Sequence, residues 1–277
     1  VAMERPTALI TGGNAGIGKA AAQQLRERGW EVVITARRPP TGEATVAGLG
    51  RHGPISWQPL DLARLDSVRE CAARLTDERG RIDVLINNAG TVRSRRELSA
   101  DGFELTFQTN HLGPFLLTHL LRPALEAAHA PRVVNVSSTM HRRSAGLDFD
   151  DLQMERGYGP MRAYADTKLA NVYFTRELAR RWPGIVSTAV HPGGVRTELG
   201  GGGELRAPGR WVWWLMKRFL RSPASGAAPV VRLAADDLDG ANGAYFHRFK
   251  QPTLIGPAAD DASARRLWEA SESLLGI

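Results

Sequence analysis

The chain has 277 residues, of which 43% are hydrophobic, enough to bury one sizeable core, and we predict a single domain over residues 1–277. Its only cysteine, Cys71, excludes an intrachain disulfide and a site built from several thiolates, and no metal site is expected. The net charge of +7 comes from scattered arginines with acids between them, so nucleic-acid binding is not expected. No apolar run approaches the roughly 20 residues that span a bilayer and no secretory signal is recognisable, so we expect a cytoplasmic protein without a transmembrane anchor.

Short β-type runs alternate with helical patterns along the chain. The expected strands are apolar on both faces, as in Val32-Val33-Ile34, which is typical of a parallel sheet covered on both sides. This alternation predicts an α/β fold with one doubly wound, Rossmann-type domain, a mainly parallel sheet and helices on both faces. The expected strands are residues 7–11, 31–35, 55–60, 84–87, 132–137 and 185–191, and the expected helices are residues 16–28, 67–79 with Ser67 as N-cap, 103–121 and 161–181.

A glycine-rich segment, Thr11-Gly12-Gly13-Asn14-Ala15-Gly16-Ile17-Gly18, joins the first expected strand to the first helix. Glycines allow a tight turn there and bring backbone N–H groups and the helix N-terminus against a pyrophosphate. A glycine-rich turn without a ligand is the alternative. The strand–turn–helix context favours dinucleotide binding.

The end of the second strand indicates which dinucleotide is bound. An acidic residue in this region would accept hydrogen bonds from the ribose 2′-OH of NAD, but Thr35-Ala36-Arg37-Arg38 contains none. A guanidinium suits a 2′-phosphate through its charge and its fork of donors. Two solvated surface arginines are the alternative, and we favour NADP(H) as the cofactor.

Polar side chains lie after three later strands, and each is ambiguous alone. Asp61-Leu62 closes the third strand, where the carboxylate could meet an adenine amino group or cap a helix. Asn87-Asn88-Ala89-Gly90 ends the fourth strand, with small residues where a backbone must approach a cofactor. Asn110 is a polar residue in an apolar helix and needs a buried partner. The Ser138 hydroxyl, after the fifth strand, could point into the same crevice or cap the next segment of the chain.

Tyr164 and Lys168 lie four residues apart in an expected helix, so both side chains leave the same face. Free tyrosine has a pKa of about 10, and a nearby cation favours the phenolate. We therefore expect the pKa of Tyr164 to be lowered, which would make its proton available near neutral pH. A solvated helix face is the alternative for this spacing alone.

In this order the motifs resemble those of the short-chain dehydrogenase/reductase family, over essentially the whole chain. Thr-Gly-x-x-x-Gly-x-Gly, Asn-Asn-Ala-Gly, Asn-x-Ser-Ser, Tyr-x-x-x-Lys and, at residues 192–197, Pro-Gly-x-x-x-Thr are all present. Segments such as Asn110-His111-Leu112-Gly113-Pro114 and Lys168-Leu169-Ala170-Asn171 are similar to the retinol-dehydrogenase-like branch. Thr167 departs from the family pattern, which has serine before the lysine.

The resemblance implies roles for the matched residues. Tyr164 would be the acid/base, Ser138 would hold the substrate oxygen, and Lys168 would bind the nicotinamide ribose and lower the Tyr164 pKa. Asn110 would hold a proton-relay water. Gly12, Gly16 and Gly18 would contact the pyrophosphate, Asp61 the adenine, Asn88 the adenosine side and Thr197 the carboxamide or phosphate. The expected cofactor contacts are completed by Asn14, Ile17, Arg37, Leu62, Ala89, Gly90, Pro192, Gly193 and Val195, with Tyr164 and Lys168 themselves.

We therefore expect an NADP(H)-dependent oxidoreductase that interconverts a carbonyl and an alcohol on a bulky hydrophobic substrate. The alternatives are a biosynthetic, polyketide-like ketoreductase or ene reductase of the same family, a dinucleotide-binding regulator without turnover, and a membrane-surface binding protein. A homo-oligomer and peripheral membrane contact are compatible with each.

The tryptophan-rich residues 211–220 suggest a substrate lid, which we expect over residues 200–225 with glycines 200–203 as its hinge. A helix that packs its apolar side on the core is an equally weighted alternative.

Overall fold

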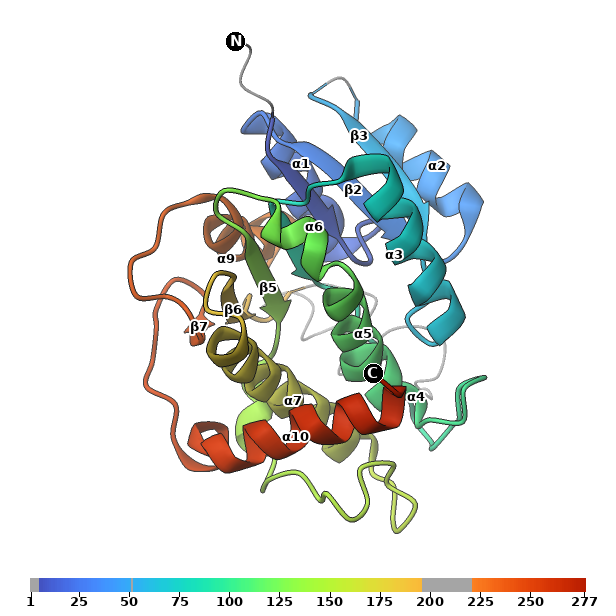
Figure 1. The fold of residues 1–277 in the computed structure, drawn as a ribbon, viewed down its shortest axis with the longest axis vertical. Coiled ribbons are helices and arrows are strands. Elements are labelled where there is room, and N and C mark those ends of the chain that lie inside the picture. Colours follow the sequence, from blue (N-terminus) through green and yellow to red (C-terminus); the bar gives the residue numbers. More distant parts are fainter. Residues whose placement is uncertain (1–4, 51, 196–220) are drawn as a thin grey trace.

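The computed structural model describes residues 5–50, 52–195 and 221–277. Within these ranges, seven strands form one sheet in the order β3-β2-β1-β4-β5-β6-β7, and every neighbouring pair is parallel (Figure 1). The predicted doubly wound α/β fold is confirmed. The strands are β1 (Thr7–Ile10), β2 (Glu31–Ala36), β3 (Ile55–Pro59), β4 (Val84–Asn87), β5 (Arg132–Val136), β6 (Val186–His191) and β7 (Ala244–His247).

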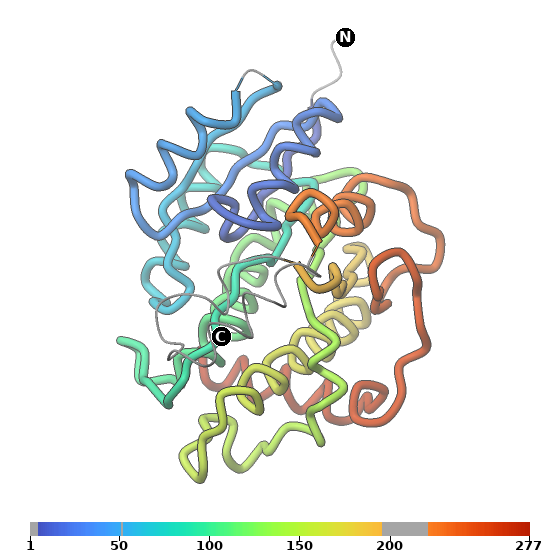
Figure 2. The backbone as a smooth tube through the Cα atoms, turned by 180° about the vertical axis from the view of Figure 1, so that it is seen from behind, coloured from blue at the N-terminus to red at the C-terminus, as the bar shows by residue number. Residues whose placement is uncertain are grey.

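Helices cover both faces of the sheet because successive strand residues point to opposite sides and both sides are apolar. Leu9 of β1 belongs to the core beneath one helical layer, and Ile10 to the core beneath the other. Figures 1 and 2 show the two layers from opposite sides. The Ile10 side carries α1 (Gly16–Glu27), α2 (Pro39–Gly48) and α9 (Pro223–Ala235); the Leu9 side carries α3 (Leu65–Arg79), α5 (Gly113–Leu120), α6 (Arg122–Glu126) and α7 (Pro160–Arg181), with α10 (Asp261–Leu275) lying across α7.

Several elements differ from the sequence prediction. Ser67 is not a helix N-cap, because α3 begins at Leu65 after Arg64 and the Ser67 hydroxyl accepts a hydrogen bond from the Asp61 N–H at 2.9 Å. In addition, α2, α9, β7 and α10 were not predicted from the sequence. Proline hides two of these helices from sequence-based prediction, because it is normally unfavourable in a helix interior. α2 begins with two prolines, and α9 contains Pro229 in its interior.

The helix expected over residues 103–121 is interrupted by a π-helical segment. α4 (Leu105–Phe107) leads into η1 (Gln108–Leu112), where the N–H of Gly113 donates to the carbonyl of Gln108 in the wider i+5 pattern, and α5 comes next. Pro114 has no N–H and cannot bond the Asn110 carbonyl in the α-helical i+4 pattern. The proline therefore accounts for the irregular turn that contains Asn110.

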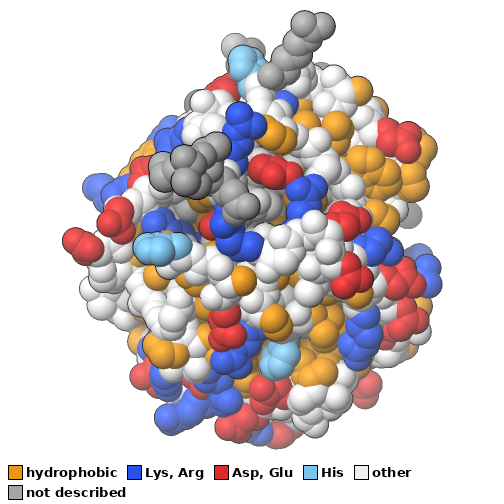
Figure 3. Space-filling view, turned by 45° about the horizontal axis from the view of Figure 1, so that its top comes forward, with side chains coloured by type: hydrophobic (Ala, Val, Ile, Leu, Met, Phe, Trp, Pro, Cys, Tyr) orange, Lys and Arg blue, Asp and Glu red, His pale blue; other side chains and the backbone are white. Residues whose placement is uncertain are grey.

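Much of the arginine charge is used in ion pairs within the molecule. Arg176 and Arg180 of α7 both pair with Asp261 at the start of α10. Positive and negative side chains are accordingly intermixed over the face drawn in Figure 3. None of the helices in the described ranges is long and apolar enough to cross a membrane.

Arg26, near the end of α1, is only 3% exposed, and its guanidinium donates to main-chain carbonyls. It reaches Leu49 O at 3.0 Å, Gly50 O at 2.9 Å and Gly53 O at 2.7 Å. These bonds hold the connection between α2 and β3 against α1.

Arg26→Ala should lower the free energy of unfolding by at least about 1.5–3 kcal/mol, because buried carbonyls lose a charged donor. Chemical denaturation monitored by circular dichroism measures this. Arg28→Ala is the matched control: Arg28 pairs with Asp236 at 2.7 Å on the surface, so its loss should cost less than about 1 kcal/mol. Equal effects for both variants would show that Arg26 does not fasten this connection.

Candidate active site

The polar residues singled out in the sequence gather at the carboxyl ends of β1, β4 and β5, which meet at one edge of the parallel sheet. Thr11 and Asn88 join the first two of these ends. The Thr11 hydroxyl accepts from the N–H groups of Asn88 and Ala89 at 3.0 and 3.1 Å. The Asn88 amide donates to Thr11 O at 2.8 Å. Asn88 therefore fixes the start of the glycine-rich turn.

The glycine-rich turn has the form of an anion cradle. Gly12 adopts φ +64°, and a Cβ on Gly18 would lie 2.6 Å from both the Asn88 amide nitrogen and Gly12 O. α1 begins after Ala15, which offers no side-chain cap to the N–H groups of the first turn. These donors, at the positive end of the helix dipole, fit the pyrophosphate of a dinucleotide.

Two arginines and a threonine define the neighbouring end of β2. The Thr35 hydroxyl accepts from the N–H of Gly12 at 3.2 Å and so ties β2 to the cradle. Arg37 and Arg38 come after Ala36 on exposed backbone, with Arg38 immediately before α2. The exposed guanidiniums lie where the sequence predicts a 2′-phosphate contact.

Asp61 is not a helix N-cap, although that was one of its two expected roles. Its carboxylate accepts from the N–H of Ala63 at 3.1 Å and closes a turn ahead of α3, whose N-cap is Arg64. Leu62 is buried beside Gly113, where a Cβ would lie 2.6 Å from Leu62 O. The adenine contact stays a prediction.

Asn110 finds the buried partners that its sequence context required. Its side-chain oxygen accepts from the Thr91 N–H at 2.7 Å, and its nitrogen donates to Thr91 O at 2.9 Å and to the Thr167 hydroxyl at 3.0 Å. Threonine at 167 thus keeps the hydroxyl that the family's serine would supply. A Cβ on Gly90 would lie 3.3 Å from the Asn110 oxygen and 3.6 Å from Lys168 Nζ, so glycine keeps this space open.

Lys168 is buried close to Tyr164. Its Nζ lies 5.5 Å from the Tyr164 ring centroid and donates to Val136 O at 3.0 Å. Burial lowers the pKa of Lys168 to about 8. Burial also raises the pKa of Tyr164 to about 12, opposed by the nearby Ser138 hydroxyl. The expected lowering of the Tyr164 pKa is therefore wrong, because the loss of solvent outweighs favourable contacts; the phenol is neutral at pH 7.

Ser138 combines the two roles left open by its sequence position. Its hydroxyl accepts from the N–H of Met140 at 3.2 Å and caps the short helix η2 (Thr139–Arg143), and it also interacts with the Tyr164 phenol. The adjacent Ser137 hydroxyl donates to Lys168 O at 2.8 Å. The two serines thus connect the end of β5 to both members of the Tyr-x-x-x-Lys pair.

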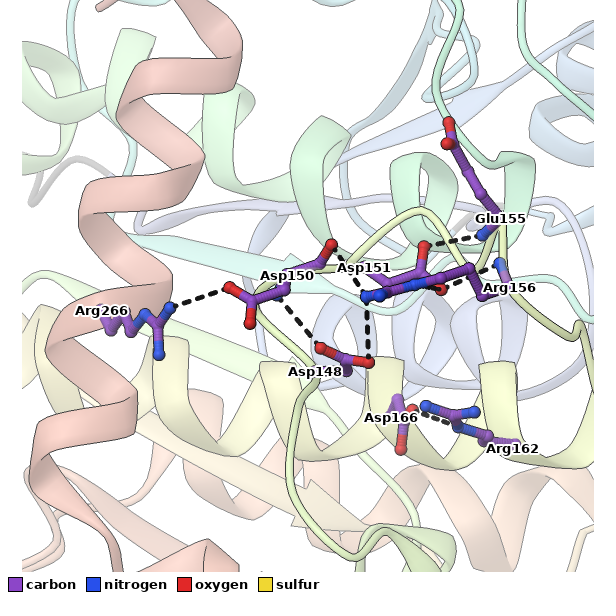
Figure 4. Close-up of polar contacts among 8 residues, drawn as sticks. All are labelled: Asp148, Asp150, Asp151, Glu155, Arg156, Arg162, Asp166 and Arg266. Atoms are coloured by element: carbon purple, nitrogen blue, oxygen red, sulfur yellow. Dashed lines mark hydrogen bonds and ion pairs between the residues drawn. The ribbon is translucent and has the colours of Figure 1, made fainter.

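The long segment between Ser138 and α7 is held by its own acidic side chains (Figure 4). Asp151 accepts from the N–H groups of Glu155 and Arg156 at 2.7 and 3.0 Å. The pKa of Asp151 is held below its usual value by these bonds, and the bond from the Arg156 N–H has the largest effect. Asp150 reaches Arg266 of α10 at 3.5 Å. The segment therefore has internal fastenings ahead of the helix that carries Tyr164.

Some residues of this site were not predicted from the sequence. Thr91 has no side-chain signal, since it acts through its main chain. Asn171, whose side-chain amide lies 3.3 Å from Val136 O, could have been found from its spacing, one helical turn after Lys168.

Pro192 and Gly193 come after β6, with Gly193 at φ +99°. Thr197 and residues 200–220 of the expected lid, with its tryptophans, lie outside the described residues. The end of the expected lid, residues 223–225, is the first turn of α9.

The sequence is similar to known proteins over nearly its whole length. The family model described as short chain dehydrogenase matches residues 6–204. Human retinol dehydrogenase 13 is 40% identical over 98% of this chain and 85% of its own length. Human retinol dehydrogenase 11 is 37% identical over 97% of this chain and 85% of its own.

Solved structures show the same likeness. An uncharacterised protein from Mycobacterium paratuberculosis superposes with a TM-score of 0.78 at 33% identity, covering 98% of this chain and 93% of its own. The RhlG/NADP active-site complex of Pseudomonas aeruginosa has a TM-score of 0.70 at 26% identity, covering 88% of this chain and 95% of its own.

The buried Lys168 should make stability depend on pH in a defined window. Its pKa is about 8 when folded, against an ordinary value of 10.5, so between these values the unfolded chain binds more protons and stability rises with pH. Lys168→Met lacks this rise. At pH 7 the buried ammonium destabilises wild type, so Lys168→Met should be the more stable protein there. The difference in the free energy of unfolding should shrink by up to about 3 kcal/mol as pH increases from 7 to 10.5.

Urea denaturation at a series of pH values measures this difference. Lys250→Met, which removes an exposed lysine, should show no such change. A stability difference between wild type and Lys168→Met that stays constant across the window would contradict the burial of a titrating ammonium.

Proposed function

Because this chain belongs to the short-chain dehydrogenase/reductase family, in its retinol-dehydrogenase-like branch, we propose that it is an NADP(H)-dependent enzyme with Tyr164 as acid/base. Membership of the family shows that the chain is an oxidoreductase that acts on carbonyl and alcohol groups with a nicotinamide dinucleotide. The finer proposal is supported by one observation: Nζ of the buried Lys168 lies 5.5 Å from the Tyr164 ring centroid, and a Cβ on Gly90, just after β4, would lie 3.6 Å from the same nitrogen.

In the proposed reaction the residues of this chain hold the substrate oxygen and supply its proton. The nicotinamide supplies the hydride when the cofactor is bound. The Ser138 hydroxyl orients the carbonyl oxygen toward Tyr164, whose raised pKa keeps the phenol protonated and able to donate. Lys168 then stabilises the phenolate that forms, because its ammonium lies close to the ring in a site removed from water. Oxidation of an alcohol runs through the same groups in reverse.

A hydrophobic substrate is the second part of the proposal. The curated relatives are named retinol dehydrogenases, and we transfer from them only the expectation of an apolar alcohol or carbonyl. Met161 supports this, because it lies one helical turn before Tyr164 and is 55% exposed. An apolar side chain at this position suits a site that receives an apolar substrate.

NADP(H) specificity is the third part. The exposed Arg37 and Arg38 at the end of β2 support it, since a guanidinium pairs with a 2′-phosphate and no acid stands there for a ribose hydroxyl.

Tyr164→Phe should reduce kcat for carbonyl reduction by at least about 100-fold, because the ring remains but the proton donor is lost. NADPH oxidation followed by absorbance, with a panel of aldehydes and ketones, measures it. Tyr173→Phe serves as control, since Tyr173 lies on the same helix and donates to Pro257 O at 2.7 Å. Retention of more than half the wild-type kcat in Tyr164→Phe would refute the proposed acid/base.

Arg37→Ala should erase most of the preference for NADPH over NADH. Loss of one charge-assisted phosphate contact costs about 1.5–3 kcal/mol, or roughly ten- to a hundred-fold in NADPH affinity, with little change for NADH. Fluorescence titration of both cofactors gives the ratio, and Arg265→Ala, at an exposed position on α10, is the control. A wild-type protein that binds NADH as tightly as NADPH would show that Arg37 is only a surface residue.

A further inference from the structure

His141 is a buried imidazole beside the candidate active site that the proposed mechanism does not use. It belongs to the short helix η2, three residues after Ser138, and it is 3% exposed. Burial lowers its pKa from the ordinary value of 6.5, so the ring is neutral at pH 7. A neutral imidazole has one N–H donor and one bare acceptor nitrogen, so the group that it contacts determines which nitrogen carries the proton.

The ring of His141 contacts the main chain of Ser138. His141 Nδ1 lies 2.7 Å from Ser138 O. A carbonyl oxygen can only accept a hydrogen bond, so Nδ1 carries the proton and donates it. The main-chain N–H of His141 donates to the same oxygen at 3.1 Å. Two donors of one residue therefore converge on the Ser138 carbonyl.

The direction of the Nδ1–H bond is fixed by packing against the sheet. The centroids of the His141 and Tyr245 rings lie 4.6 Å apart, with an interplanar angle of 70°, in the edge-to-face arrangement that aromatic pairs prefer. Tyr245 belongs to β7 and is 1% exposed. The imidazole therefore cannot turn away from Ser138 without disturbing a ring that is buried in the core.

The carbonyl and the hydroxyl of Ser138 are attached to the same Cα, so fixing the first restricts the second. On the side before Ser138, the N–H of Ser137 donates to Val190 O at 2.8 Å and ties the chain to β6. On the side after it, His141 holds the carbonyl, and because the peptide is planar this fixes the ψ angle of Ser138, which is extended at 156°. The direction of the Ser138 Cα–Cβ bond is thereby set from both sides.

The short helix η2 depends on such a contact for its shape. It has only five residues, and the geometry of 3₁₀ hydrogen bonds is poorer than that of α-helical ones. The Ser138 hydroxyl accepts from the Met140 N–H of this helix at 3.2 Å and also interacts with the Tyr164 phenol. A shift of η2 would therefore move the hydroxyl relative to the proposed proton donor.

We propose that His141 is a positioning residue that aims the Ser138 hydroxyl at the substrate oxygen by holding the Ser138 main-chain carbonyl. The inference rests on the proposed function, because that function gives the Ser138 hydroxyl its task. In the proposed reaction His141 acts only through Ser138, since its Nδ1 proton is donated to the carbonyl.

Two substitutions separate the donor from the ring. His141→Phe keeps a ring against Tyr245 but has no N–H, and it should lower kcat for carbonyl reduction by about 10- to 100-fold, the loss expected from a misplaced group at a reacting centre. His141→Asn loses the ring but places an amide N–H near the position of Nδ1. It should retain more of the wild-type kcat than His141→Phe does. The opposite order is expected from a role in packing alone and would overturn the proposal.

A double-variant cycle shows whether His141 acts through Ser138. Ser138→Ala removes the hydroxyl, so adding His141→Phe to it should lower kcat further by less than about twofold, whereas two independent losses would multiply. His119→Phe is the matched control, because His119 is a half-buried imidazole that contacts the rings of Phe115 and Trp182. Its effect on kcat should be small, and the same in wild type and in Ser138→Ala.

A second readout does not depend on turnover. In protein labelled with ¹⁵N in histidine, long-range ¹H–¹⁵N correlation spectra show which imidazole nitrogen carries the proton. The signals of His141 are identified by their absence in His141→Asn, and the proton should be on Nδ1. A proton on Nε2 at pH 7 would overturn the proposal, because the Ser138 carbonyl would then face a bare nitrogen.

The outcomes separate the two proposals. If wild type turns over no carbonyl or alcohol, the proposed function fails, and the position of the imidazole proton alone decides whether His141 holds the Ser138 carbonyl. If wild type is active but folded His141→Phe keeps the wild-type kcat, or if its loss multiplies with that of Ser138→Ala, the positioning role is overturned. Should His141→Phe not fold, the position of the proton in wild type decides.

Discussion

A lysine ammonium buried at the carboxyl edge of a parallel sheet is the constraint on which this structure depends. Burial disfavours the charged form of Lys168, and no carboxylate pairs with it among the ion pairs of the described residues. Its compensation comes instead from dipoles and a π face: Val136 O at 3.0 Å and the Tyr164 ring at 5.5 Å. A carboxylate partner would neutralise the field that a phenolate needs. The buried charge therefore lowers the stability of the fold, but it leaves a positive charge without a carboxylate partner beside the proton donor.

The polar groups around this charge hold strand ends and helices in register. Asn110 joins the loop after β4 to α7 through Thr91 and Thr167, while Asn87 of β4 donates to Asn135 of β5 at 2.9 Å. Both networks lie inside the apolar layers, where an unpaired amide would be costly, so they favour one arrangement of the loops. The π-helical turn carries Asn110, whose side chain bonds Thr167 of α7 at 3.0 Å.

The sequence predicted those parts of the fold that local pattern determines. Apolar strands such as Val32-Val33-Ile34 and the order of the motifs indicated the sheet, its parallel sense and the edge where the site lies. Prediction failed where a hydroxyl has more than one candidate donor nearby: Ser67 accepts from the Asp61 N–H, six residues earlier, and does not cap a helix. The pKa of Tyr164 is raised and not lowered, because burial, which depends on packing, outweighs the neighbouring cation that the sequence spacing indicates. The bond from Asn110 to Thr167 likewise depends on a proline-induced turn that meets another helix.

The protonation of Lys168 can be measured directly in this chain. The sequence contains few lysines, Lys19, Lys168, Lys217 and Lys250, so ¹³C NMR of protein labelled at lysine Cε gives a resolvable spectrum. The signal of Lys168 is identified by its absence in a Lys168 variant, and its shift is followed through a pH titration. A buried ammonium without a carboxylate partner should titrate with a midpoint near pH 8. A midpoint at or above its ordinary value of 10.5 would contradict it, because the ammonium would then be solvated or paired with a negative charge.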